Sequence, residues 1–167
     1  MLRRKIYITG DIDEQSYLAF SKRLTVLEND KKSGTKVEVE LSSGGGETYY
    51  GLAFASRMRL AKCPLHVTAH GLVASAAVLI LAYGTKGFRF MTREARVMVH
   101  EDSAKLKGEK TYLKKEIAEI EALDDHWNEL MEARTGTLAR EWIELDKSTT
   151  YLSAEECLNL GLVDKVI

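Results

Sequence analysis

The chain has 167 residues, 45% of them hydrophobic, and its 24 Lys and Arg balance 25 Asp and Glu to a formal net charge of -1. A chain of this length buries about 70% of the surface that it exposes when unfolded, so a single domain needs no disulfide or metal for stability. The near-neutral charge argues against nucleic acid as a partner, because nucleic-acid-binding proteins carry a clustered basic excess.

Neither the cysteines nor the apolar segments indicate secretion or membrane insertion. Cys63 and Cys157 are too few for a disulfide framework and lack CxxC spacing, so we expect reduced, packed thiols. The strongest apolar stretch, 69–83, is interrupted by His70 and Ser75, and no segment reaches the roughly 18 apolar residues of a membrane span. We therefore expect a cytoplasmic protein that makes no membrane contact.

Extended and helical patterns alternate along the chain. The predicted elements begin with a strand at Lys5–Thr9, a helix at Ser16–Leu27, a strand at Val37–Leu41, a helix at Tyr50–Leu60, a strand at Leu65–Ala69 and a helix at Ala74–Tyr83. They continue with strands at Gly87–Phe90 and Arg96–His100, helices at Glu109–Arg134 and Leu138–Asp146, a capping box at Ser153 and a strand at Val163–Ile167. Strands that alternate with helical crossovers indicate an α/β fold with a largely parallel sheet.

The helix predicted at Glu109–Arg134 is unusually long. Its apolar residues recur in steps of three and four, and Gly136 ends the pattern. At about 1.5 Å per residue, such a helix reaches well beyond the radius of a small domain. We expect part of it to project from the domain and to contact a partner.

Three loops that follow predicted strands carry the residues most suited to chemistry. They are Ser42–Glu47 with its glycine run, His70–Ala77 with Ser75, and Val97–His100. The glycine run is compatible with a plain turn and equally with a turn whose N–H groups bind a phosphate or an oxyanion.

Ser75 and His100 each have a structural and a catalytic interpretation. Ser75 suits a helix N-cap or a buried hydroxyl, and His100 suits a histidine packed in the core. Together they suit acyl transfer, since a serine hydroxyl becomes a good nucleophile when an imidazole takes its proton. The Ala76 N–H, at a helix N-terminus, is then a donor to the oxyanion.

Other titratable residues do not indicate a cofactor. His66 and His70 share a strand face at i and i+4, but no third metal ligand is apparent, so we expect no metal and no other cofactor. The charged pieces between Lys105 and Asp125 are typical of solvated helix faces.

Four ordered motifs resemble those of the proteolytic subunit of the Clp protease, the ClpP family. Residues 71–77 (GLVASAA) resemble its serine motif G-x-A-A-S-M-G, and residues 96–100 (RVMVH) its histidine motif R-V-M-I-H. Residues 41–46 (LSSGGG) resemble its glycine loop, and residues 151–164 its closing pattern F-L-S-A-x-E-A-x-x-x-G-L-V-D. The resemblance implies a ClpP/crotonase-like repeated ββα-type fold, with residues 1–167 forming one ClpP-like protease domain.

The resemblance assigns roles to individual residues. It implies that Ser75 is the nucleophile, that His100 is the general base, and that the Gly46 and Ala76 N–H groups bind the oxyanion. The family is a self-compartmentalising, ATP-dependent serine endopeptidase that cleaves small or unfolded polypeptides through an acyl-enzyme. Its partners are further copies of the same chain in heptamer-like rings, single or stacked in pairs, and an AAA+ unfoldase. The region of about 105–134 corresponds to its handle helix.

The chain departs from the family pattern at the third catalytic position. Counting back from the closing pattern places Thr149 where the family has the triad aspartate, and threonine supplies no charge to stabilise the imidazolium. Asp146, Glu101 and Asp102 are the acids near enough in sequence to compensate. The strand after His100 also differs from the family's glycine-rich strand, and Gly44 replaces its proline, which should loosen the loop.

Two further hypotheses follow from these departures. The chain is a catalytically weakened or inactive structural subunit of a Clp-type ring, or it is an acyl-CoA hydratase or isomerase of the related crotonase fold. The crotonase fold shares the glycine-loop oxyanion site but uses no serine nucleophile.

Overall fold

The computed structural model describes residues 4–30, 34–101 and 107–167. In chain order its elements are β1 (Lys5–Ile12), α1 (Glu14–Glu28), β2 (Val37–Gly46), α2 (Thr48–Arg59), β3 (Leu65–Ala74), α3 (Ala76–Ala82), β4 (Arg89–Met91), β5 (Arg96–Val99), α4 (Lys110–Thr135), α5 (Ala139–Asp146), β6 (Thr150–Leu152), α6 (Ala154–Asn159) and β7 (Lys165–Val166). The alternation predicted from the sequence, an α/β fold with a largely parallel sheet, is confirmed.

The strands form one mostly parallel sheet in the order β1-β2-β3-β4-β7. Strand β3 is long enough to pair with two strands in succession. Its first half pairs with β4 through Val67–Ala69, and its second half pairs with β5 through Leu72–Ala74. Strand β6 then pairs antiparallel with β5. The carboxyl ends of β3 and β5 therefore lie side by side.

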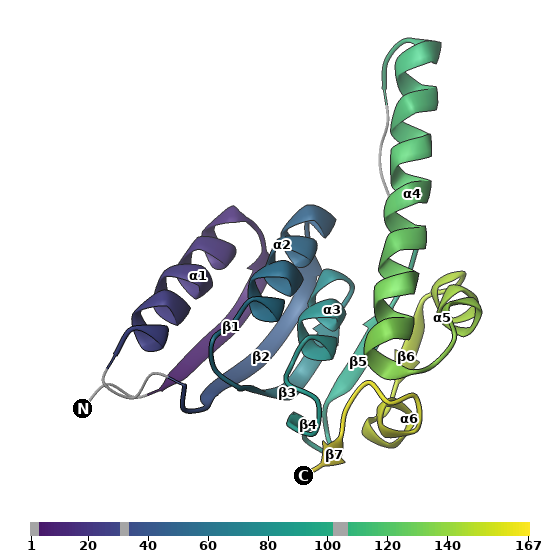
Figure 1. The fold of residues 1–167 in the computed structure, drawn as a ribbon. Coiled ribbons are helices and arrows are strands. Elements are labelled where there is room, and N and C mark those ends of the chain that lie inside the picture. The colour runs from purple at the N-terminus through teal and green to yellow at the C-terminus, as the bar shows by residue number, and fades with distance from the viewer. Residues whose placement is uncertain (1–3, 31–33, 102–106) are drawn as a thin grey trace.

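Helices α1, α2 and α3 lie together over one face of the sheet (Figure 1). Alternate residues of β1, β2 and β3 are buried, such as Ile6, Val39 and Val67, as the period of two in a strand requires. All seven residues of α3 are buried. An apolar helix of this kind is stable only inside the domain, which explains why its sequence shows no polar face.

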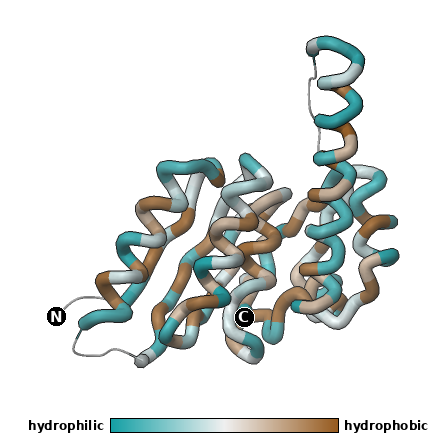
Figure 2. Tube along the Cα trace, turned by 45° about the horizontal axis from the view of Figure 1, so that its top comes forward, coloured by the Kyte–Doolittle hydropathy of each residue, from teal (hydrophilic) through white to brown (hydrophobic). Residues whose placement is uncertain are grey.

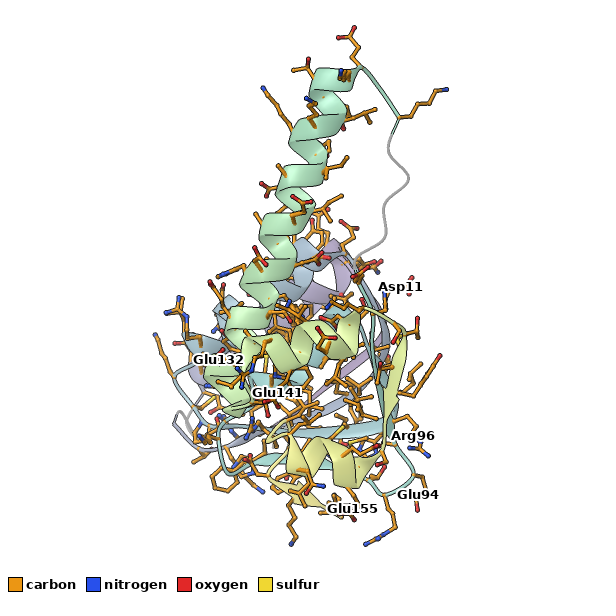
Figure 3. All side chains as sticks on the ribbon, turned by 90° about the vertical axis from the view of Figure 1, so that its right-hand side faces the viewer. Asp11, Glu94, Arg96, Glu132, Glu141 and Glu155 are labelled. Carbon is orange, nitrogen blue, oxygen red and sulfur yellow. The ribbon has the colours of Figure 1, made fainter. Side chains whose placement is uncertain are left out.

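Helix α4 stands away from the rest of the molecule over much of its length (Figure 1). Only Asn128 and Met131 of its described side chains are buried, and both lie in its C-terminal half. Figure 3 shows side chains of the N-terminal half extending from the projecting helix, and Figure 2 shows hydrophobic residues among the hydrophilic ones there. The expected long helix, ended by Gly136 in the left-handed conformation, is confirmed, while residues 105 and 106 of the expected handle lie outside the described residues.

Polar contacts fix the base of α4 to the domain. Arg134 donates from Nε to the Ala82 carbonyl at 3.0 Å and from Nη2 to the Gly84 carbonyl at 2.7 Å, which satisfies the C-terminal end of α3. The Trp127 ring packs edge-on against Trp142 with centroids 5.9 Å apart. Glu132, labelled in Figure 3, accepts the N–H of Ala139 at the start of α5 at 2.7 Å. These contacts hold the C-terminal half of α4 against α3 and α5.

The structure differs from the sequence prediction mainly at strand ends. Strands β2 and β3 extend beyond their apolar runs, to Gly46 and Ala74, because backbone pairing with neighbouring strands continues there. Strand β6 was not expected from the sequence. The capping box at Ser153 is confirmed, with Ser153 Oγ accepting from the Glu156 N–H.

The cysteines behave as the sequence indicated: Cys63 and Cys157 are both free and buried. Burial raises the pKa of Cys157 to about 12, so its thiol stays protonated at neutral pH. Among the described residues, no helix combines the length and the apolar character needed to cross a membrane.

Candidate active site

The sheet brings Ser75 and His100 to the same edge. Ser75 follows β3 and His100 follows β5, and these strands pair in parallel with Ala74 opposite Met98. The Ser75 N–H donates to the Met98 carbonyl at 2.9 Å, so the pairing continues one residue past β3. Both side chains line one pocket. The convergence that sequence spacing left open is thus a consequence of strand pairing.

Ser75 has an unusual backbone conformation. Its φ of 52° and ψ of -128° make it the one non-glycine residue with positive φ among the described residues. An L-residue at such a φ is strained, and strain of this kind concentrates at functional sites. Ser75 occupies the N-cap position of α3, but its side chain makes no capping hydrogen bond. Ser75 is therefore the N-cap residue of α3, as one interpretation of the sequence had it, but its hydroxyl does not cap the helix.

The glycine loop lies directly against Ser75. A Cβ at Gly45 would stand 2.7 Å from both the Ala74 carbonyl oxygen and the Ser75 Cβ, and Gly45 has a φ of +95°. A Cβ at Gly46 would stand 2.3 Å from the Ile12 carbonyl oxygen. Both positions require glycine for two reasons, since the backbone is in a region unfavourable to other residues and there is no space for a side chain.

Hydrogen bonds order this loop despite Gly44. The Ser43 hydroxyl donates to the Gly10 carbonyl at 2.6 Å and accepts the Gly45 N–H at 3.1 Å. These bonds tie the end of β2 to β1 and offset the flexibility expected from glycine in place of proline. They also engage the Gly45 N–H, which leaves Gly46 as the next N–H donor along the loop.

The Ala76 N–H begins α3. The first N–H groups of a helix have no carbonyl partner within the helix, and the Ala76 N–H donates to no acceptor among the described residues. The partial positive charge of a helix N-terminus favours a negative ligand at this point. Ala76 lines the same pocket as Ser75 and His100, so its N–H is near the reacting atoms that the proposed chemistry requires.

His100 is half-buried, and a main-chain carbonyl holds its ring. Its Nδ1 lies 2.6 Å from the Glu101 carbonyl oxygen. The Glu101 N–H in turn donates to the Asp146 carbonyl at 3.0 Å, which ties the segment after β5 to the end of α5. His100 is therefore not a histidine enclosed in the apolar core.

Thr149 does not contribute to the pocket. The β5–β6 register ends with Val99 opposite Thr150, the residues next to His100 and Thr149 in the chain. Thr149 is nevertheless exposed and is not among the residues that line the pocket, whereas Asp146 is. Of the other acids considered from the sequence, Glu101 is exposed, and Asp102 lies outside the described residues.

Helix α4 contributes residues that sequence reasoning did not assign to the site. Asp124 and Trp127 line the pocket, as does Thr48 at the start of α2. Asp124 and Trp127 are three residues apart and so share a helix face, but nothing in the sequence shows that this face meets Ser75. The cavity has a volume of about 30 Å³.

The two histidines on the strand face have separate partners. His66 stacks on Phe88 with ring centroids 4.0 Å apart, and His70 Nε2 lies 2.5 Å from a Glu40 carboxylate oxygen. Within the described ranges no cluster of three candidate ligands exists. Burial raises the pKa of Glu40, but hydrogen bonds from Lys5 and His70 outweigh it and lower the pKa overall.

The fold and the pairing of serine with histidine are those of a family of serine peptidases. The model of the Clp protease family matches residues 1–167, and the chain belongs to this family. Its structure is similar to that of an asparagine-to-aspartate variant of ClpP1 from Listeria monocytogenes, with a TM-score of 0.89 and 25% sequence identity over 99% of this chain and 91% of that one. The ClpP-like fold is therefore established, and the crotonase alternative gives way to the Clp protease family.

Proposed function

We propose that the chain is a ClpP-like serine endopeptidase that cleaves small or unfolded polypeptides through an acyl-enzyme on Ser75. The observation that carries the proposal is the meeting of Ser75 and His100 in one pocket, at the carboxyl ends of paired strands and beside the Ala76 N–H. The proposal treats residues 1–167 as one ClpP-like protease domain.

Acylation begins when Ser75 Oγ attacks the carbonyl carbon of the scissile peptide bond. His100 Nε2 takes the hydroxyl proton as the new C–O bond forms. The carbonyl oxygen becomes an oxyanion, which accepts hydrogen bonds from the Gly46 and Ala76 N–H groups. The imidazolium then gives its proton to the leaving amine, the C–N bond breaks, and an ester on Ser75 remains.

Deacylation repeats these steps with water. The water oxygen attacks the ester carbon while His100 takes a proton from the water, and the same two N–H groups hold the second oxyanion. When the intermediate collapses, His100 returns the proton to Ser75 Oγ and the carboxylic acid product leaves. No metal or organic cofactor takes part in this scheme.

Assembly into a ring completes the proposal. Helix α4 carries Tyr112 and Ile117 with 50% and 48% of their surface exposed, on the half that projects from the domain. Apolar residues that project in this way favour contact with another copy of the chain. We propose heptamer-like rings, single or stacked, with an AAA+ unfoldase supplying the ATP-dependent step. The free thiols of Cys63 and Cys157 support a reducing compartment, the cytoplasm.

A second candidate function is a structural subunit with little or no activity. The exposure of Thr149, away from the pocket, favours it, because no acid stands where the family motif has one. The two candidates make different predictions for the same variant. If the chain is a peptidase, Ser75→Ala loses peptide hydrolysis. If it is a structural subunit, Ser75→Ala has the same peptidase activity as wild type.

The experiment is hydrolysis of a set of fluorogenic peptides by the size-resolved oligomer, comparing wild type with Ser75→Ala. Ser42→Ala serves as the control, since it changes a serine within β2 that does not line the pocket. We expect turnover in wild type and in the control, and none in Ser75→Ala. Equal rates in wild type and Ser75→Ala would reject the peptidase proposal.

A further inference from the structure

His100 Nδ1 has an acceptor in the main chain. It lies 2.6 Å from the Glu101 carbonyl oxygen. A carbonyl oxygen only accepts hydrogen bonds, so the proton of the neutral ring is on Nδ1 and the lone pair is on Nε2. A general base needs this tautomer, which in a serine triad is fixed by the aspartate. The Glu101 carbonyl can therefore fix the tautomer without an acid at position 149.

The position of this carbonyl depends on Asp146. The Glu101 N–H donates to the Asp146 carbonyl at 3.0 Å, so the peptide that orients His100 is attached to the last residue of α5. Pairing of Val99 with Thr150 holds the same segment from the β6 side. The main chain of Asp146 thus helps to place the ring of His100.

A carbonyl is neutral and stabilises an imidazolium less than a carboxylate does. Among the described residues, the carboxylates that line the pocket of His100 are Asp146 at the end of α5 and Asp124 of α4, and the exposed Glu101 follows His100 in the chain. The remaining polar groups in the pocket, Thr48 and Ser75, are neutral. Asp146 and Asp124 are both half-buried, and of the two only Asp146 has its main chain joined to the Glu101 peptide.

We infer that Asp146 is the positioning residue of this site. Its main chain holds the carbonyl that fixes the tautomer of His100, and its carboxylate supplies the negative charge that Thr149 lacks. The consequence of this role for catalysis rests on the proposed function. The effect of Asp146 on the protonation of His100 does not rest on it, because that effect involves only the imidazole ring and its neighbours.

The test measures the protonation of His100 directly, in the assembled full chain. Diethyl pyrocarbonate modifies neutral imidazole only, so its rate at His100, followed by peptide mass spectrometry from about pH 5 to about pH 9, reports the pH at half-maximal reactivity. The variants are Asp146→Asn, Asp146→Glu, Asp124→Asn and Thr149→Val. Asp146→Asn keeps the main-chain bond and the side-chain shape and removes the charge. A fluorophosphonate probe on Ser75 is measured on the same samples.

We expect Asp146→Asn to lower the pH at half-maximal modification of His100 relative to wild type, since loss of a nearby negative charge favours the neutral ring. Asp146→Glu keeps the charge and should have a midpoint of His100 modification close to that of wild type. Thr149→Val should have the wild-type midpoint. Labelling of Ser75 at pH 8 is slower in Asp146→Asn than in wild type, since a weaker base takes the hydroxyl proton less readily.

Two results would overturn the inference. One is that the midpoint of His100 modification in Asp146→Asn equals that of wild type. The other is that the midpoint shifts in Asp124→Asn or Thr149→Val and not in Asp146→Asn. Failure of the proposed function has a different signature. In that case the probe leaves Ser75 unlabelled in every variant, while the modification of His100 still decides the role of Asp146.

Discussion

Replacement of Gly45 by alanine should displace the glycine loop from Ser75 and so disrupt the candidate active site. The new Cβ would stand 2.7 Å from the Ala74 carbonyl oxygen and from the Ser75 Cβ, on a backbone with φ of +95°. Real Cβ atoms do not approach backbone oxygen so closely, so the loop and Ser75 must move apart. Gly44→Ala is the matched control, because its Cβ meets nothing within 4 Å and its φ is not positive.

The cost of Gly45→Ala follows from two terms. An L-residue in a left-handed conformation loses about 1–2 kcal/mol, and overpacking against fixed backbone costs about 1–3 kcal/mol. The free energy of unfolding should therefore fall by about 2–5 kcal/mol. Gly44→Ala should raise it by about 0.5 kcal/mol, since alanine restricts the unfolded chain.

Urea unfolding followed by circular dichroism, at one protomer concentration for all samples, measures these changes. The rate of fluorophosphonate labelling at Ser75 reports the geometry of the site, and a displacement near 1 Å is expected to slow it about 100-fold. If Gly45→Ala matched Gly44→Ala in both stability and labelling, the close approach of the glycine loop to Ser75 would be refuted.

Three other predictions concern the core, the thiols and assembly. Burial acts to raise the pKa of Asp164, but hydrogen bonds from the buried Arg89 outweigh it and lower the pKa overall. Its contribution to stability is therefore complete above about pH 4 and is lost as the pH falls through the lower folded value, and Asp164→Asn should cost about 2 kcal/mol of unfolding free energy at pH 7. Urea titrations at several pH values test this, and a cost independent of pH would contradict it. Cys157, with its pKa raised to about 12, should resist iodoacetamide at pH 8 until urea unfolds the chain, and rapid alkylation of the native protein by intact mass would disagree. Ile117→Asp, on the projecting half of α4, should shift size-exclusion profiles to smaller species without lowering thermal stability, whereas an unchanged profile would exclude this side chain from assembly.

The sequence was sufficient for the elements whose pattern is local. The apolar spacing of α1, α2 and α4 and the β-branched runs of β1 to β3 show which faces are buried, and burial determines their structure. Gly136 and Ser153 marked a helix end and a helix start because capping depends on a few adjacent residues.

Features that depend on tertiary pairing could not be predicted in this way. Strand β6 has three residues and exists through its antiparallel pairing with β5, so its own sequence gives little signal. The extension of β3 to Ala74 and the positive φ of Ser75 depend in the same way on the neighbouring β5 and glycine loop. The sequence indicated the N-cap position of Ser75 but not this backbone conformation.

The candidate site was predicted in part. The motifs identified Ser75, His100 and the glycine loop, and strand pairing explains their meeting. Alignment to the motif gave Thr149 for the third position, but Thr149 does not line the pocket, whereas Asp146, one of three acids named from the sequence, lines it from the end of α5. The contribution of α4 through Asp124 and Trp127 depends on how that helix docks, which its own sequence does not specify.

The most direct test of the proposed peptidase is labelling of the size-resolved oligomer with a fluorophosphonate probe, followed by intact mass and peptide mapping. Wild type should gain one adduct per chain at Ser75, Ser75→Ala should gain none, and His100→Ala should react far more slowly, since no imidazole takes the proton of the hydroxyl. An unlabelled wild-type oligomer, or an adduct that persists in Ser75→Ala, would contradict the assignment of Ser75 and His100 as an acyl-transfer pair.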